Sequence, residues 1–463
     1  MSFVDVVLTI VYFLLLTLVG SIIRNRHRSN PIYQKWYLKG LITKLTACVC
    51  FCLVYTFYYD YGGDTRGYFR DTTTIADAIW FGPEVIWKIL QRDYQNVDSQ
   101  TLDILYKLMY DSPMEYYTVH LSVPFNILGF GSYFSMSLLI AFFAYTGVWR
   151  FFMLFAAKFP KLEREMAFSI LFVPSVVFWG SGLNKDTFII CFVGYFLYYI
   201  NKLFEGKIFN LKYILIAGVS GYLIFIIKAY VIVSLIPGVL IWRTLYLRNR
   251  ISIGWMRSLV LPIFGGATIL VVVYALSVLG QYNKKYSVGS FVTTAQSMQG
   301  WHYQEGHNTS EQYGRGSSYT LGDYEETPMG LLKVFPAAVN VTFFRPYIWE
   351  AKNAAMLAQA IESLLFLFFT VFTILKVGPL RVYSYISNDS MLLMCVVFAI
   401  FFGFAVGFSS YNFGALSRYK IPAVPFFITA LFIIRHKAKV RGIKRAEVGR
   451  KKRGKQVVPG FSD

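Results

Sequence analysis

The sequence is poor in charged residues. Aspartate, glutamate, lysine and arginine together make up 15% of its 463 residues, whereas 56% are hydrophobic and 19% are aromatic. A soluble domain cannot bury that much apolar surface, and repeated apolar runs are long enough to cross about 30 Å of hydrocarbon as helices. The composition therefore predicts an integral membrane protein of the all-α class.

Cysteine is also scarce. The five cysteines, Cys48, Cys50, Cys52, Cys191 and Cys395, all lie inside apolar runs, so no disulfide framework is implied. Cys48 and Cys52 have the spacing of residues on one face of a helix. Their pattern resembles such a face more than it resembles a metal site.

Acidic residues are outnumbered by basic ones, 25 to 45, for a net charge of +20. Such a positive charge could indicate binding to nucleic acid. The basic residues, however, form short clusters between apolar runs, where the positive-inside rule accounts for them. We therefore expect membrane lipids as partners and no nucleic acid.

Two further features are missing. The N-terminus, MSFVDVVLTIVYFLLLTLVG, lacks a basic n-region and a small-residue cleavage site, so it is interpreted as a retained first span. No internal repeat is evident, which leaves the inverted-repeat architecture of transporters without support.

The apolar runs predict about eleven transmembrane helices. They lie at 3–23, 41–59, 133–157, 166–180, 187–204, 211–227, 229–246, 258–280, 354–375, 390–409 and 421–434. When the linkers are assigned alternately to two sides, most lysines and arginines share the side of the C-terminus, and most acidic residues fall on the other. The positive-inside rule then makes the basic side cytoplasmic and the N-terminus external, in a cytoplasmic (inner) membrane.

This topology divides the chain into five segments. They are an extra N-terminal helix with a basic loop (1–40), a membrane bundle with an acidic outer loop at 58–132 (41–280), a polar outer loop (281–353), C-terminal helices (354–434) and a basic cytoplasmic tail (435–463). Apolar residues at helical spacing, interrupted at Pro83, predict interfacial helices in the first outer loop. The second loop is Gly-rich and Tyr-rich, and predicts an irregular lid.

The sharpest polar motif is YYDYGGDTRGYF, just after the second span. It places Asp60 and Asp64 outside the membrane, with Arg66 and Arg70 beside them. A partly shielded carboxylate there can take a proton from a hydroxyl group or help to bind a divalent cation. The alternative is an interfacial turn with solvated acids.

A second motif is FVPSVVFWGSGLNKDTF, where proline and glycine break a helix before Lys185 and Asp186 begin the next one. Exposed backbone N–H groups together with Lys185 would suit a phosphate oxygen. The alternative is that Asn184 and Asp186 are helix caps. Farther along, Lys228 interrupts an apolar run, either as a snorkelling residue or as a buried cation facing an anionic group.

Two late motifs add further cations. FFRPYIWEA places Arg345 and Glu350 at the end of the second outer loop, and YNFGALSRYKIPAVP places Arg418 and Lys420 at the outer mouth of the last span. Arginine suits a bidentate grip on phosphate, and the alternative for Arg418 is an interfacial anchor. Because the topology brings all these distant motifs to one face, we expect a single outer cavity that holds an anionic headgroup near a carboxylate.

The order of these features resembles the GT-C membrane glycosyltransferases, which use polyprenyl-phosphate or polyprenyl-diphosphate sugars. RYKIPAVPF is similar to the R-Y-x-x-P-x-x-P run near a late span of several such enzymes, and FFRPYIWEA and PSVVFWGSGLNKD look like segments of bacterial envelope-polysaccharide proteins. The resemblance spans about residues 41–430. The chain departs from the family in its extra N-terminal span and in lacking an acidic pair such as DD, DE or ExD.

The resemblance implies an inverting glycosyltransferase with a lipid-linked sugar donor and a glycan, lipid or protein acceptor. The family's catalytic acid maps to Asp64, or else to Asp60. Its donor-phosphate cations map to Lys185, Lys228 and Arg418, to which the late motif adds Arg345. Supporting roles are expected for Arg66, Asp186, Lys420 and Glu350.

Two other functions stay open. An O-antigen-type polymerase or ligase has a long late outer loop, and would depend on Arg315, Arg345, His302 or His307 in place of Asp64. A flippase or transporter would need charged or broken helices near the midplane of the membrane, where the spans supply little beyond Glu362 and Lys228.

Overall fold

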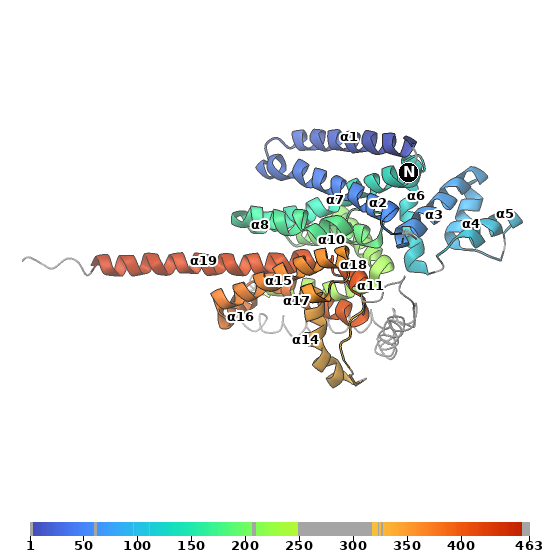
Figure 1. The fold of residues 1–463 in the computed structure, drawn as a ribbon. Helices are drawn as coiled ribbons and strands as arrows, with labels where there is room; N and C mark the ends of the chain where they lie inside the picture. The colour runs from blue at the N-terminus through green and yellow to red at the C-terminus, as the bar shows by residue number, and fades with distance from the viewer. Residues whose placement is uncertain are drawn as a thin grey trace, which may run out of the picture.

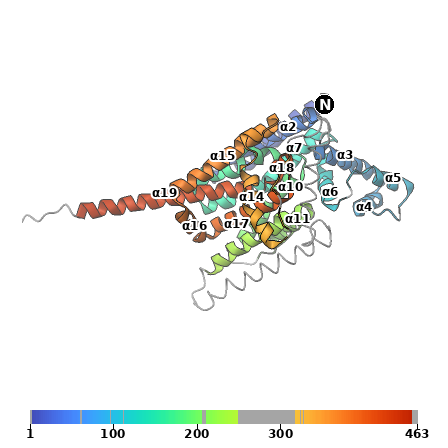
Figure 2. The ribbon, with the colours of Figure 1, turned by 60° about the horizontal axis from the view of Figure 1, so that its bottom comes forward.

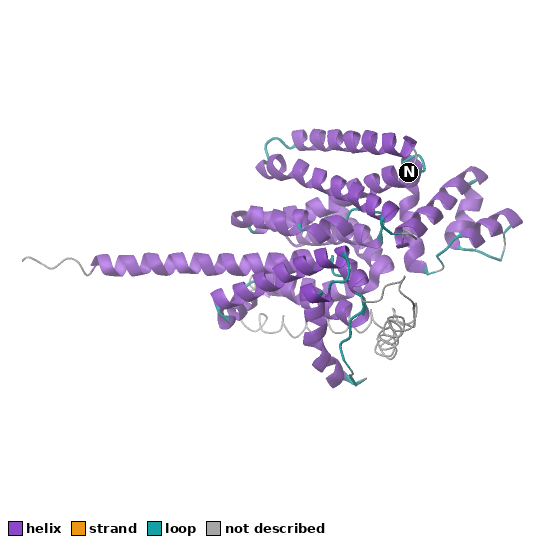
Figure 3. Cartoon of the chain, in the orientation of Figure 1, coloured by secondary structure: helices purple, strands orange, loops and turns teal. Residues whose placement is uncertain are grey.

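In the computed structural model the chain is a bundle of helices (Figure 1). The structure describes residues 3–59, 63–95, 97–110, 112–205, 210–248, 317–322, 324–325 and 327–455. Within these ranges no β-strand forms, and an isolated antiparallel bridge joins Ser318 to Asn412 (Figure 3). The all-α prediction is confirmed.

The helices have the following bounds. They are α1 (Phe3–Arg26), α2 (Leu38–Phe57), α3 (Gly63–Ala78), α4 (Pro83–Gln91), α5 (Ser99–Lys107), α6 (Pro113–Leu128), α7 (Tyr133–Lys158), α8 (Glu163–Ala167), α9 (Pro174–Trp179), α10 (Lys185–Glu205), α11 (Leu211–Arg248), α14 (Pro328–Phe344), α15 (Ala354–Val377), α16 (Pro379–Ser387), α17 (Ser390–Ser409), α18 (Phe413–Tyr419) and α19 (Val424–Lys455). Short 3-10 or π-helical turns occupy Tyr33–Tyr37, Ile79–Phe81, Pro160–Leu162, Phe168–Phe172 and Ile348–Glu350.

Several helices are long and apolar enough to cross a membrane, as a multi-pass protein requires. By length and composition the described residues contain seven, or eight if the bent pair α18 and α19 forms one span. The seven are Phe3–Arg26, Tyr33–Phe57, Tyr133–Lys158, Lys185–Glu205, Leu211–Tyr246, Ala354–Val377 and Ser390–Ser409. The predicted number of eleven is not confirmed, and the predicted span 258–280 lies outside the described residues.

The two ends of the bundle are called here the Asp64 end and the Lys158 end, after a residue at each. At the Asp64 end, Ser132 before α7 donates a hydrogen bond to Asp5 near the start of α1 (2.8 Å). At the Lys158 end, the last residue of α7 forms an ion pair with Glu205, the last residue of α10. Figures 1 and 2 show the long helix α19 leaving the bundle on the side opposite to α3, α4 and α5.

The helix α11 reverses direction at Lys228, whose backbone angles are not helical (φ −148°, ψ 78°). Tyr213 packs against Tyr199 with ring centroids 5.5 Å apart, and Arg243 donates a hydrogen bond to Asn201 (2.9 Å). Both ends of α11 therefore lie beside the last turns of α10, while Lys228 lies beside its first turn. The reversal falls where the sequence predicts the turn between the spans 211–227 and 229–246.

The predicted span 166–180 has a different form. A π-helical turn at Phe168–Phe172 and the extended residue Val173 separate α8 from α9, because Pro174 disfavours a helical conformation of the preceding residue. The turn after α9 then packs closely against α2, since a Cβ atom at Gly182 would lie 2.0 Å from the ring of Phe51. Only glycine permits this approach, which fixes the start of α10.

The first outer loop is helical, as predicted. Between α3 and α4 the chain breaks at Gly82 and Pro83, and α3–α6 form a layer at the Asp64 end (Figure 1). Trp80 is 90% exposed and Trp87 is 61% exposed. Exposed tryptophans on short amphipathic helices are typical of segments in a membrane interface.

The segment 281–353, predicted as an irregular loop, contains the helix α14. This helix packs against α17, where a Cβ atom at Gly407 would lie 2.1 Å from the carbonyl oxygen of Ala338. Thr342 in addition donates a hydrogen bond to the carbonyl of Gly403 (2.6 Å). The close approach of α14 and α17 depends on small residues. The polar sequence before α14 dominates the segment 281–353, which is why the segment was predicted as a loop.

Candidate functional site

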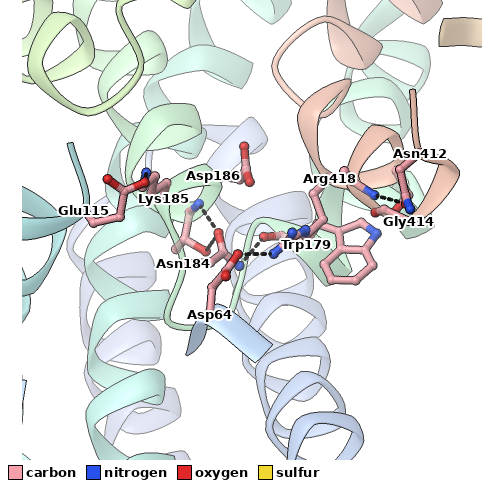
Figure 4. Close-up of polar contacts among 12 residues, drawn as sticks. Asp64, Glu115, Trp179, Asn184, Lys185, Asp186, Asn412, Gly414 and Arg418 are labelled. Carbon is pink, nitrogen blue, oxygen red and sulfur yellow. Dashed lines mark hydrogen bonds and ion pairs between the residues drawn. The ribbon is translucent and has the colours of Figure 1, made fainter. Parts of the chain in front are cut away.

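Asp64 lies in the first turn of α3, the helix that follows α2 in the chain. Its Oδ2 accepts a hydrogen bond from Nη1 of Arg418 at 3.0 Å, although 354 positions separate the two residues in the sequence (Figure 4). The Asp64 side chain is 53% exposed and that of Arg418 is 21% exposed. The pair thus stands at the surface of the bundle, where the carboxylate is accessible from outside.

Arg418 belongs to the short helix α18, which is bent by 66° from the following helix α19. Its guanidinium lies 6.0 Å from the ring centroid of Trp179 and 5.9 Å from that of Tyr419 (Figure 4). Both rings flank the guanidinium at the outer limit of the cation–π distance.

Lys185, in the first turn of α10, forms an ion pair with Glu115 in the first turn of α6 (Figure 4). Burial alone would raise the pKa of Glu115, but the charge and hydrogen bond of Lys185 outweigh it, so the pKa lies below its ordinary value of 4.5. Glu115 therefore carries a negative charge at neutral pH.

A third pair is buried beneath the first two. Nζ of Lys228 donates a hydrogen bond to Oδ1 of Asp186 at 2.6 Å, and the two side chains are 6% and 5% exposed. The ammonium group also lies 4.6 Å from the ring centroid of Tyr419, the neighbour of Arg418. Of the two interpretations of Lys228, the structure shows a buried cation facing an anionic group.

The three pairs form one group, called here the Asp64 cluster. Its members are Asp64, Glu115, Lys185, Asp186, Lys228 and Arg418. The pKa of Tyr68 on α3 is raised well above 10 mainly by burial, and Asp64 and Glu115 raise it further while Arg418 opposes them. Asp64, Glu115 and Arg418 thus act on one side chain, and Lys185, Asp186 and Lys228 join the group through their ion pairs and the ring of Tyr419.

Two other predicted cations, Arg345 and Lys420, lie in a second group. Arg345 forms an ion pair with Glu350, and its carbonyl accepts a hydrogen bond from Ser363 (3.1 Å). Nζ of Lys420 donates a hydrogen bond to the same serine (3.4 Å). Glu362, also on α15, accepts a hydrogen bond from the backbone of Ser175 (3.1 Å). Ser363 thus links Arg345 to Lys420, and among the described residues neither cation forms a hydrogen bond or ion pair with Asp64.

Arg66 points into the bundle, toward Thr56 (3.3 Å) and the ring of Tyr133. Asn184 is a helix cap, as the simpler interpretation of its motif predicts: it accepts a hydrogen bond from the backbone of Thr187 and donates one to the carbonyl of Trp179. Asp60, His302, His307 and Arg315 lie outside the described residues.

Sequence reasoning missed two acids of this region, Glu115 and Asp71. Asp71 is fully buried and accepts hydrogen bonds from the backbone of Met109 (2.9 Å) and Tyr110 (3.1 Å). Tyr110 in turn donates a hydrogen bond to the carbonyl of Asp64 (3.1 Å). Neither acid stands in a motif that distinguishes it from other outer-loop acids, so only their three-dimensional partners identify them.

Two cavities lie elsewhere in the protein. One, of about 10 Å³, is lined by residues that include Lys44 and Tyr145, and the other, of about 200 Å³, lies between α10 and α11. In the described part of the chain, no group of three or more histidine, cysteine or acidic side chains is placed to hold a metal ion.

Comparison with protein-family models, curated proteins and solved structures gives no match to this chain.

The ion pair of Lys185 and Glu115 makes the stability of the folded protein depend on pH. Because the pKa of Glu115 is lower in the folded protein, the stability that this group contributes is present above about pH 4.5 and is lost as the pH falls through its folded-state pKa. We expect Glu115→Gln to lower Tm at pH 7 and to flatten the fall of Tm between pH 5 and pH 3. Glu84→Gln is the control, since Glu84 is 86% exposed and 3.9 Å from Lys88. Parallel Tm curves for wild type and Glu115→Gln would contradict this.

Proposed function

We propose that this chain is a GT-C-like glycosyltransferase that takes sugar from a polyprenyl-phosphate or polyprenyl-diphosphate donor. The observation that carries the proposal is the contact of Asp64 with Arg418. An accessible carboxylate, beside an arginine flanked by aromatic rings and near Lys185, combines a base with phosphate-binding cations at one end of a membrane bundle.

The reaction follows from these groups. Asp64 takes the proton of the acceptor hydroxyl, whose oxygen forms a bond to the anomeric carbon of the donor sugar. The bond from that carbon to the phosphate oxygen breaks, and its electron pair stays on the lipid phosphate. Arg418 and Lys185 stabilise the charge that develops there. Displacement in a single step from the opposite face inverts the anomeric configuration.

The present partners of the cations suggest how the donor enters. A donor phosphate that binds Arg418 displaces the carboxylate of Asp64, which is then free to act as a base. The pair of Glu115 and Lys185 can open in the same way, because both side chains keep contact with solvent, at 26% and 15% exposure. Lys228 and Asp186 stay closed and support the start of α10 from below.

The membrane topology is part of the proposal. The eleven predicted spans place the N-terminus outside the cytoplasmic membrane and the C-terminus in the cytoplasm. In this arrangement the Asp64 end faces outward, and the Lys158 end, with Arg24, Lys202 and the basic helix α19, faces the cytoplasm. Transfer then serves the synthesis of a cell-envelope polysaccharide or glycoconjugate.

The role of Arg418 can be tested by Arg418→Lys. The lysine keeps the charge but loses the planar fork that grips a phosphate, so we expect the KM for a polyprenyl-phosphate sugar to rise about tenfold, equivalent to about 1.4 kcal/mol. Radiolabelled sugar transfer in membranes containing equal amounts of protein measures this. The control is Arg381→Lys, in α16 at the Lys158 end. An unchanged KM would remove Arg418 from the donor site.

A further inference from the structure

The second membrane span contains a lysine, Lys44, that belongs to none of the polar motifs. It lies on α2, within the apolar segment Tyr33–Phe57, and is 5% exposed. Among the residues that the structure describes, no carboxylate forms an ion pair with it. An ionisable side chain inside a membrane span is costly and usually faces a specific partner. The partner of Lys44 therefore indicates what this charge does.

That partner is a backbone carbonyl at the end of α9. Nζ of Lys44 donates a hydrogen bond to the oxygen of Gly180, which lies 136 positions later in the sequence. Gly180 is the residue that caps the end of α9, where the last carbonyls have no partner within the helix. The contact ties α2 to residues 180–184, called here the α9–α10 turn.

The same face of α2 contacts this turn a second time. Phe51 lies seven residues after Lys44, about two helical turns farther along α2. A Cβ atom at Gly182 would lie 2.0 Å from the ring of Phe51, and that ring also meets Trp179, with centroids 6.1 Å apart. Ring contacts tolerate sliding, whereas a hydrogen bond restricts both distance and direction. Lys44 is thus the contact that fixes the position of the turn along α2.

The α9–α10 turn connects two parts of the Asp64 cluster (Figure 4). Just before the turn, the ring of Trp179 lies 6.0 Å from the guanidinium of Arg418. Just after it, Lys185 begins α10 and forms its ion pair with Glu115. Asp64 lies in the first turn of α3, the helix that follows α2. A shift of the turn along α2 would therefore move Lys185 relative to Asp64.

Lys44 itself is remote from the cluster. It stands 13 residues before Phe57, the last residue of α2, which corresponds to about 20 Å of helix. We propose that Lys44 is a positioning residue, which holds the α9–α10 turn where Lys185 and Asp64 can act on the same substrate. This inference rests on the proposed transferase function, because Lys44 acts through the donor-phosphate cation Lys185.

Hydrogen exchange tests the anchor without reference to activity. Lys44→Met keeps most of the side-chain length but removes the donors, whereas Lys44→Arg keeps them and can use the cavity of about 10 Å³ that Lys44 lines. In the full-length protein in detergent, we expect faster exchange of residues 179–187 in Lys44→Met and wild-type exchange in Lys44→Arg. Arg243→Met is the matched control, because Arg243 is 3% exposed and bound to neutral Asn201, but near the Lys158 end.

Transfer kinetics then test the positioning role. A variant that is only less well folded supplies less active protein, so its maximal rate falls while its donor KM stays constant. A displaced Lys185 instead weakens the grip on the donor phosphate. We expect Lys44→Met to raise the KM for a polyprenyl-phosphate sugar about tenfold, since a misplacement of about 1 Å can cost about 10²-fold. Lys44→Arg should restore the donor KM.

Two results would overturn the inference. Unchanged exchange in Lys44→Met would mean that Lys44 does not hold the turn. Faster exchange with an unchanged donor KM would mean that the turn does not position the site. If the wild type transfers no sugar from any polyprenyl-phosphate donor, the proposed function fails instead, and hydrogen exchange alone decides whether Lys44 holds the turn.

Discussion

Replacing Asp64 with asparagine is expected to abolish glycosyl transfer while the protein remains folded. The amide keeps the size of the carboxylate but cannot take the proton of the acceptor hydroxyl, and a positioned general base contributes about 10²–10⁴-fold to the rate. The stability should change little, because the Asp64 side chain is 53% exposed and partly exposed ion pairs contribute about 0–1 kcal/mol.

The measurement is product formation in cells and membranes, normalised to protein level, with Tm recorded for each variant. Asp103→Asn is the matched control, since Asp103 is an exposed acid of the same outer layer that is paired with Lys107. Arg345→Ala is compared in parallel. If Asp64→Asn is active and Arg345→Ala is inactive, the hypothesis of a polymerase or ligase replaces that of an acid-base transferase.

Much of the fold could be predicted because membrane spans are encoded by simple hydropathy. The reversal at Lys228 and the break before Pro83 follow from a charge and a proline inside apolar runs, both of which have local physical causes. The break at Val173 is equally local, since the proline of the motif FVPSVVFWGSGLNKDTF indicates it, although the apolar run 166–180 was assigned as one span. The helix α14 was obscured for a different reason: its partner in packing is the glycine face of α17, which lies about 70 residues later.

The candidate site could be predicted as a set of residues, but not as pairs. Topology alone places Asp64, Lys185 and Arg418 at one end of the bundle, and the structure brings them together. The choice of partner depends on side-chain geometry, however, so the sequence could not show that Arg345 is paired with Glu350 and stands apart. Glu115 was missed because a single acid at a helix start has many structural explanations.

The second large effect is expected at the buried pair beneath the site. Lys228→Met removes the ammonium group and leaves the carboxylate of Asp186, which is 5% exposed, without its charged partner. Loss of one member of a buried pair costs about 3–5 kcal/mol. Unfolding in mixed micelles of dodecyl maltoside and dodecyl sulfate measures the loss. Lys202→Met is the matched control, because Lys202 on α10 also lies near a tyrosine ring but is exposed.

The double variant Lys228→Met with Asp186→Leu separates support from catalysis. Replacing both charges by apolar groups removes the uncompensated carboxylate, so most of the lost stability should return. If the pair only supports the start of α10, transfer activity returns with stability. If stability returns and transfer does not, one of the two charged groups takes part in transfer, and the proposal that this pair stays closed is wrong. A single variant as stable as wild type would contradict the buried pair itself, because an exposed ammonium would leave Asp186 in contact with water.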